Sequence, residues 1–174
     1  MKNLFLILLL NFFFISVNAQ TNFVYDISGL SPKFIIVDVD SMNQSDLCSA
    51  TVNWIKNYYK NPDEVLKSKI ENKKIRFSGM RSSYLEFNFL GKVSYLDVFY
   101  TIEVEFKDGK YKFQPIYLEY QYDINKTSIN LEDGSLYYNN KNQLRKTFAG
   151  TPSGIQKLFN DINESIFKYF ETEY

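Results

Sequence analysis

Hydrophobic positions change from a strand period to a helical period in the first third of the chain. Residues 34–39 are rich in β-branched side chains and lie between a proline and an aspartate, which predicts a short strand. Apolar residues then recur at helical spacing up to Asn61-Pro62, and Ser41 or Ser45 could cap the helix start. The recurring positions are Leu47, Thr51, Trp54, Ile55 and Tyr58. This stripe predicts a helix that packs on a sheet.

Two hairpins are predicted where apolar and polar residues alternate around short turns. Asn72-Lys73 and Asp108-Gly109 are the turn signals, and the second is the stronger. The predicted cross-strand partners are Ile70 with Ile75, Ser68 with Phe77, Val104 with Phe113, Phe106 with Tyr111, and Glu105 with Lys112. Both registers produce one apolar face and one charged face.

The apolar positions change parity after the second hairpin. Phe113 is apolar at an odd position, whereas Leu118 is apolar at an even one. Because proline cannot donate to a strand ladder and is found at bulges and edges, we expect a bulge near Pro115. With one extra residue inserted there, Phe99 faces Glu119 on the outer side of the sheet.

The last third of the chain combines an irregular segment with a strongly periodic one. Residues 123–152 have no sustained period, so we expect an irregular insertion that contains a short strand or turn. A long apolar stripe follows, and Ser153 with Gln156 forms a capping-box pattern at its start. We therefore predict an α+β fold in the order β-α-β-β-β-β-α, with an antiparallel sheet and two helices packed on one of its faces.

The first twenty residues have the pattern of a secretory signal peptide. Lys2 precedes an apolar stretch at residues 4–16, and Val17-Asn18-Ala19 matches the small-residue site at which cleavage would follow Ala19. The stretch is shorter than the ~20 residues of a bilayer-spanning helix, so we expect export to the periplasm or beyond the cell, with no membrane span after cleavage. The predicted division is a signal peptide at 1–19, an N-terminal extension at 20–33 and a single domain at 34–174.

Composition and charge exclude several functional classes. The 174 residues include 20 basic and 20 acidic side chains but no histidine, which excludes Ser-His-Asp and Cys-His catalysis and histidine-ligated zinc. Loss of Lys2 with the signal peptide leaves a net charge of −1, so we expect no nucleic-acid partner. Cys48 has no second cysteine to pair with, and we interpret it as a small packed side chain. No cofactor is expected.

Several segments resemble a known family. They are Asp46-Leu47, Asn53-Trp54-Ile55-Lys56-Asn57-Tyr58-Tyr59, Asn61-Pro62-Asp63-Glu64-Val65, Lys73-Lys74-Ile75-Arg76-Phe77-Ser78-Gly79, and residues 100–113. Together they are similar to the bacterial exported domain-of-unknown-function 4468 family, described as having a TBP-like fold. The resemblance covers about residues 34–122 and, more loosely, the final helix, but not 84–94 or 123–152. It implies a fold and an unassigned activity, and it transfers no functional residue.

One pair of acidic residues could in principle carry catalysis. Glu103 and Glu105 share a strand face with Cβ atoms roughly 6.5–7 Å apart, a spacing that could suit a glycosidase carboxylate pair. A general acid needs a raised pKa, however, and Lys112 opposite Glu105 favours the ionised carboxylate. We interpret the pair as part of a charged solvent face.

A second acidic group lies at the predicted helix start. Asp38 and Asp40 could bind a hard cation together with Asn43 or Asp46. The spacing lacks the glycine and terminal glutamate of a calcium loop, and acids at a helix start stabilise the helix dipole. No metal site is therefore predicted.

Three aromatic residues form the candidate binding patch. The predicted register places Tyr95, Phe99 and Tyr117 near one another on the outer face, where flat rings could stack on a sugar or anchor a protein. Alternatively, residues 84–94 or 123–152 fold over these rings and complete the core.

Three hypotheses about function follow from these patterns. We expect a non-catalytic binding or envelope-associated module, with an envelope protein or a glycan as its partner. The alternative is a carboxylate-dependent enzyme that acts on glycans. The third hypothesis is a homo-oligomer formed through the aromatic patch.

Overall fold

The computed structural model describes residues 22–173, so the predicted signal peptide at residues 1–19 lies outside the described residues. The strands are β1 (Val24–Asp26), β2 (Gly29–Ser31), β3 (Ile35–Asp38), β4 (Leu66–Ile70), β5 (Lys74–Phe89), β6 (Lys92–Lys107), β7 (Lys110–Tyr122) and β8 (Asn125–Ser128). The helices are α2 (Gln44–Tyr58), α3 (Pro62–Val65) and α4 (Thr151–Glu173), with short 3₁₀ turns η1 (Ser135–Tyr137) and η2 (Lys146–Phe148).

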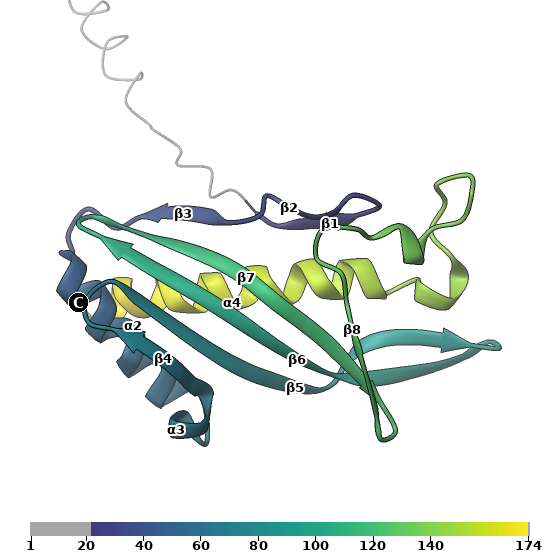
Figure 1. The fold of residues 1–174 in the computed structure, drawn as a ribbon, viewed down its shortest axis with the longest axis horizontal. Helices are drawn as coiled ribbons and strands as arrows, with labels where there is room; N and C mark the ends of the chain where they lie inside the picture. Colours follow the sequence, from purple (N-terminus) through teal and green to yellow (C-terminus); the bar gives the residue numbers. More distant parts are fainter. Residues whose placement is uncertain (1–21, 174) are drawn as a thin grey trace, which may run out of the picture.

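One antiparallel sheet dominates the molecule. Its strand order is β3-β7-β6-β5-β4, β8 pairs with another part of β7, and β1 and β2 form a separate hairpin. Helices α2 and α4 pack together behind this sheet (Figure 1). The predicted α+β class is confirmed, although the structure contains more strands than the predicted order. Among the described residues, no helix is long and apolar enough to cross a membrane.

The core lies between the sheet and the two helices. Alternate residues of the central strands point into it, including Phe77, Val104 and Phe113, each 0% exposed. The stripe predicted for α2 is buried from Leu47 to Ile55, and the stripe of α4 is buried along most of its length. Burial of these apolar faces, at roughly 25 cal/mol per Å², holds the helices on one side of the sheet.

Both helices begin at residues other than the predicted caps. At α2 the side chain of Asn43 accepts a hydrogen bond from the backbone N–H of Asp46 at 2.9 Å, so the predictions of Ser41 and Ser45 as caps were wrong. Asn43 has the extended backbone that an N-cap requires, with φ −78° and ψ 169°. Helix α4 begins at Thr151, two positions before the predicted cap Ser153.

The second predicted hairpin is confirmed in register. Val104 pairs with Phe113 and Glu105 with Lys112, and the expected bulge shifts the register between Thr101 and Ile102. Phe99 consequently faces Glu119, as predicted. The unpaired residue is Ile116, which is 37% exposed and does not point into the core.

The register predicted for the first hairpin was wrong. Ile70 pairs with Lys74 rather than Ile75, because the turn contains three residues instead of two. Asn72 has a φ of 53°, a left-handed conformation that asparagine tolerates better than most residues. The shift leaves Ile70 55% exposed on edge strand β4.

Two segments without a sequence period extend the sheet. Residues 84–94 complete a long hairpin of β5 and β6, with Phe89 opposite Lys92, and this hairpin forms one end of the molecule (Figure 1). Strand β8 turns back on β7, with Tyr122 opposite Asn125. The expectation of a short strand within residues 123–152 is therefore confirmed.

Residues 22–33 pack against the core. Phe23 is 1% exposed, and its ring contacts those of Phe113 and Phe159 at 5.9 and 6.2 Å between centroids. The backbone N–H of Phe23 donates to Asn160 Oδ1 at 2.8 Å, and Asn160 Nδ2 donates back to the Phe23 carbonyl at 3.0 Å. These contacts hold the segment before β1 on helix α4.

Candidate functional site

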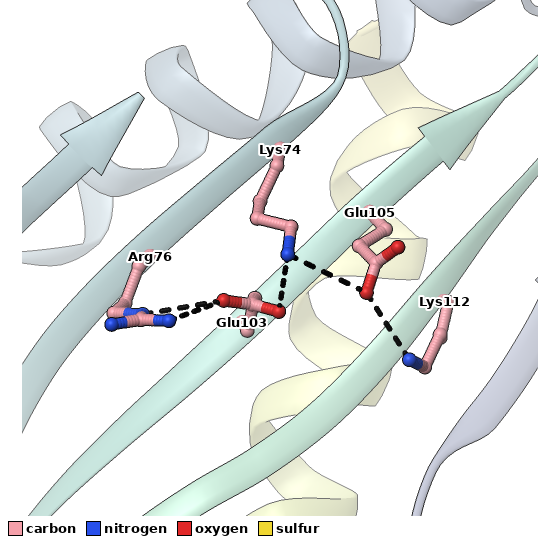
Figure 2. Close-up of polar contacts among 5 residues, drawn as sticks. All are labelled: Lys74, Arg76, Glu103, Glu105 and Lys112. Atoms are coloured by element: carbon pink, nitrogen blue, oxygen red, sulfur yellow. Dashed lines mark hydrogen bonds and ion pairs between the residues drawn. The ribbon is translucent and has the colours of Figure 1, made fainter. Parts of the chain in front are cut away.

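The sheet face opposite the helices, here called the open face, carries a row of alternating charges. Strand alternation turns Lys74 and Arg76 of β5, Glu103 and Glu105 of β6, and Lys112 of β7 to this side (Figure 2). The row crosses three neighbouring strands, so every side chain lies on a rigid element.

Glu103 is the centre of this row and is 7% exposed. Lys74 Nζ lies 2.8 Å from Glu103 Oε1, and Arg76 Nη2 lies 2.7 Å from Glu103 Oε2 (Figure 2). Burial acts to raise the pKa of Glu103, but the hydrogen bonds from Lys74 and Arg76 outweigh it and hold that pKa below its usual value. An ionised Glu103 is unsuited to the role of general acid.

Glu105 is likewise paired. Lys112 Nζ lies 3.1 Å from Glu105 Oε1, which confirms the predicted cross-strand pair, and Lys74 Nζ lies 3.8 Å from the same oxygen. Both carboxylates of the glycosidase-like spacing therefore face ammonium or guanidinium groups. This is the arrangement of an ion-pair network, but only Glu105 lies on a solvent face as predicted, because the side chains of Lys74 and Arg76 bury Glu103.

The three residues of the predicted aromatic patch differ in environment. Tyr95 is 57% and Tyr117 42% exposed, whereas Phe99 is half-buried. Lys126 Nζ of β8 lies 3.8 Å from the centre of the Phe99 ring. The segment 123–152 thus covers Phe99 in part, as one alternative expected, while the other two rings stay exposed.

Phe99 and Tyr117 line a common hollow of about 390 Å³, and Tyr95 lies outside it. The hollow crosses the open face from α3 and β4 to β7. Its other lining residues are Asn61, Glu64, Val65, Lys67, Ser78, Gly79, Met80, Tyr100, Thr101 and Glu119. The combination of rings, hydroxyl groups and charges suits recognition of a ligand that has both apolar and polar surfaces.

Glu119 is held in place at one side of this hollow. Lys126 Nζ donates to Glu119 Oε1 at 2.8 Å, and the Tyr117 hydroxyl donates to Glu119 Oε2 at 2.6 Å. The bond from Lys126 first, then that from Tyr117, lowers the pKa of Glu119 below its usual value. Glu119 is therefore ionised, and its two oxygens hold Lys126 and Tyr117 at this side of the hollow.

Three of the remaining sequence candidates, Asn43, Asp46 and Cys48, have structural roles. No group of metal-ligating side chains occurs within residues 22–173, and Asn43 and Asp46 bond to each other at the start of α2. Cys48 is 0% exposed, and burial raises the pKa of its thiol. The interpretation of Cys48 as a packed side chain is confirmed.

Sequence reasoning missed much of the hollow. Met80 is 48% exposed and lies opposite Phe99 in the pairing of β5 and β6. Residues of α3 and β4 form another wall of the hollow. Lys126 reaches Phe99 only because β8 pairs with β7. No local pattern in residues 123–128 signals that pairing.

Comparisons with known proteins agree on the fold. A family profile described as "Domain of unknown function (DUF4468) with TBP-like fold" matches residues 35–121. A crystal structure of a DUF4468 family protein from Bacteroides ovatus ATCC 8483 has a TM-score of 0.63 at 14% identity, over 88% of this chain and 91% of that one. A TBP-like protein from Parabacteroides distasonis ATCC 8503 has a TM-score of 0.56 at 16% identity, over 80% and 91%. No curated protein matches the sequence.

Proposed function

This chain belongs to the DUF4468 family, a domain of unknown function with a TBP-like fold. We propose that it is a non-catalytic binding module that uses its open face. The proposal includes export after cleavage at Ala19, so that the partner is an envelope protein or a glycan outside the cytoplasm. The fold by itself assigns no activity, and the case for binding rests on the site.

The hollow lined by Phe99 and Tyr117 carries this proposal. The floor of the hollow consists of paired strands, so the backbone is already ordered and loses little conformational entropy when a ligand binds. Tyr117 combines an exposed ring with a hydroxyl group, and Met80 adds a flexible apolar contact on the opposite side. An aromatic surface bordered by hydrogen-bonding groups is favourable for a sugar ring or a peptide side chain.

The electrostatics of the open face favour binding over catalysis. Glu103 and Glu119 both have lowered pKa values, so neither supplies the protonated carboxyl of a glycosidase acid. Basic and acidic groups alternate across the strands, which gives little attraction for a nucleic-acid backbone.

A photo-crosslinking experiment in the producing cells tests the proposal. A photoreactive phenylalanine analogue replaces Tyr117 in one variant and Leu136, an exposed residue outside the hollow, in the control. We expect an adduct with an envelope protein or glycan from position 117 only, and its loss when Met80→Asp is added. Three results would overturn the proposal: no adduct, the same adduct from both positions, or an adduct with a second copy of the chain.

A further inference from the structure

The hairpin of β5 and β6 extends past the start of α4. The Thr151 side chain in the first turn of α4 donates to the Glu86 carbonyl at 2.9 Å, so the helix starts beside the middle of the hairpin arm. Beyond Glu86 the strands continue through Phe89, which is 62% exposed. At this end α4 no longer covers the sheet side that it covers elsewhere, and the Phe148 ring of η2 covers that side only in part, at 5.4 Å from the Phe87 ring between centroids.

A hollow of about 480 Å³ occupies this end of the molecule, in the size range of small-molecule sites. Two hairpins that project separately in Figure 1, β5–β6 and β7–β8, contribute its walls. The apolar lining residues are Phe87, Phe89, Leu96, Tyr120 and Tyr122, and the polar ones are Lys92, Ser94, Asn125 and Thr127. Leu96 is 7% exposed and belongs to the core, so the hollow is an open continuation of the core.

Lys92 supplies the only charge in this lining. It is exposed and makes no ion pair with the acidic residues in the described part of the chain. A single ammonium group beside apolar walls complements a ligand that has one negative charge and one apolar body.

A large aliphatic side chain stands at the turn of each of the two hairpins, outside the lining of the hollow. Leu90 is 90% exposed and Ile124 84% exposed. Leu90 also has a φ of 50°, a left-handed conformation that glycine or asparagine adopts more easily than leucine. Leu90 thus opposes turn preference, and both aliphatic side chains oppose solvation, which fits a surface used for apolar contact.

We propose that this hollow binds an amphipathic anion with a single alkyl chain, of the fatty-acid class. The alkyl chain lies against Phe87, Phe89 and Leu96, and the carboxylate pairs with Lys92. This site is separate from the hollow at Tyr117, so the two proposals can fail independently.

Calorimetric titration of the purified chain with octanoate, decanoate and dodecanoate at neutral pH tests the apolar part. Burial of each added methylene is worth about 0.8 kcal/mol, so affinity should rise about fourfold per methylene. Decanoate should therefore bind roughly 15-fold more tightly than octanoate. Absence of saturable decanoate binding, or affinities that do not depend on chain length, would overturn the proposal.

A charge variant tests the polar part. Lys92→Gln should weaken octanoate binding about tenfold and leave binding of 1-octanol unchanged, while Lys56→Gln, at an exposed lysine of α2 outside both hollows, should leave both unchanged. Phe89→Asp should abolish binding of both ligands without changing the thermal unfolding midpoint, because Phe89 is exposed. Equal octanoate affinity of the wild type and Lys92→Gln contradicts the assignment of the carboxylate.

The source of the alkyl chain is tested with phosphatidylglycerol vesicles. Competition between decanoate and the vesicles indicates that the hollow takes a chain from a lipid surface, and vesicle-independent decanoate binding indicates a free fatty acid. Either result supports the site. Two results would refute the proposed site, because they assign the apolar surface to another occupant. One is vesicle binding without decanoate binding, and the other is self-association in sedimentation that decanoate does not change.

Discussion

The ring of Tyr100 lies against Gly79, its partner across β5 and β6, and a Cβ at Gly79 would stand 2.4 Å from the Tyr100 hydroxyl oxygen. Only a residue without a side chain leaves room for the ring in this position. The Tyr100 hydroxyl then reaches that of Tyr59, at 3.0 Å, just after helix α2. The glycine thus lets the sheet contact the residue at the end of the helix.

We expect Gly79→Ala to lower the free energy of unfolding by about 1–3 kcal/mol, because the tyrosine ring must move and its hydrogen bond is lost. Urea unfolding measures the change. Gly154→Ala in α4 is the matched control, since its Cβ meets only the flexible Leu85 Cδ1 at 2.9 Å and alanine favours a helix. Equal destabilisation by both variants would contradict this role of Gly79.

The segment before β1 should contribute to stability. Phe23→Ala removes a buried ring between the sheet and α4, and we expect a loss of about 3–5 kcal/mol in the free energy of unfolding. Val24→Ala, at a neighbouring position that is 49% exposed, should change it by less than about 0.5 kcal/mol. Thermal and urea unfolding compare the two variants. A small effect of Phe23→Ala would show that the segment is not part of the folded unit.

Glu103 should make stability depend on pH. Its pKa is lower in the folded chain, so its contribution is complete above the unfolded-state value of about 4.3 and is lost as the pH falls through the lowered folded-state value. We expect Glu103→Gln to cost about 1–2 kcal/mol at neutral pH and much less in acid, where the wild-type carboxylate is also protonated.

Urea midpoints of the wild type and Glu103→Gln across the acid range measure this dependence. Glu105→Gln is the control, because the Glu105 side chain is 41% exposed and its ion pairs are more solvated. A constant difference between the wild type and Glu103→Gln at all pH values would contradict the assignment.

The cap of α2 can be tested directly against the sequence prediction. Asn43→Ala should lower stability by about 1 kcal/mol, because the N–H of Asp46 loses its acceptor. Ser41→Ala should have an effect of a few tenths of a kcal/mol at most, within the range of exposed surface changes. Chemical denaturation of both variants distinguishes the two residues, and the reverse order would restore Ser41 as the cap.

Much of the fold could be predicted where the decisive preferences are local. Strand alternation and the Asp108-Gly109 turn gave the right register for β6 and β7, and Pro115 marked the parity change. The Asn72 turn was harder, because asparagine suits turns of two or three residues and the difference of one residue moves every partner on β4.

The candidate site was predictable only in part. Parity placed Phe99 and Tyr117 on one face, and the structure brings them into one hollow. Parity could not show that Lys126 lies over Phe99, or that Tyr95 lies outside the hollow. Those facts depend on strand pairing between segments whose sequences carry no periodic signal.

The sequence by itself determined the α+β class, the apolar stripes of both helices and the register of the main hairpin, because these follow from preferences between near neighbours in the chain. Tertiary structure alone decided where Phe23 docks, how β8 pairs with β7 and brings Lys126 over Phe99, and which apolar surface α4 leaves uncovered. Such contacts join residues far apart in sequence, and their free energy depends on which surfaces meet, a quantity that local alternation does not contain.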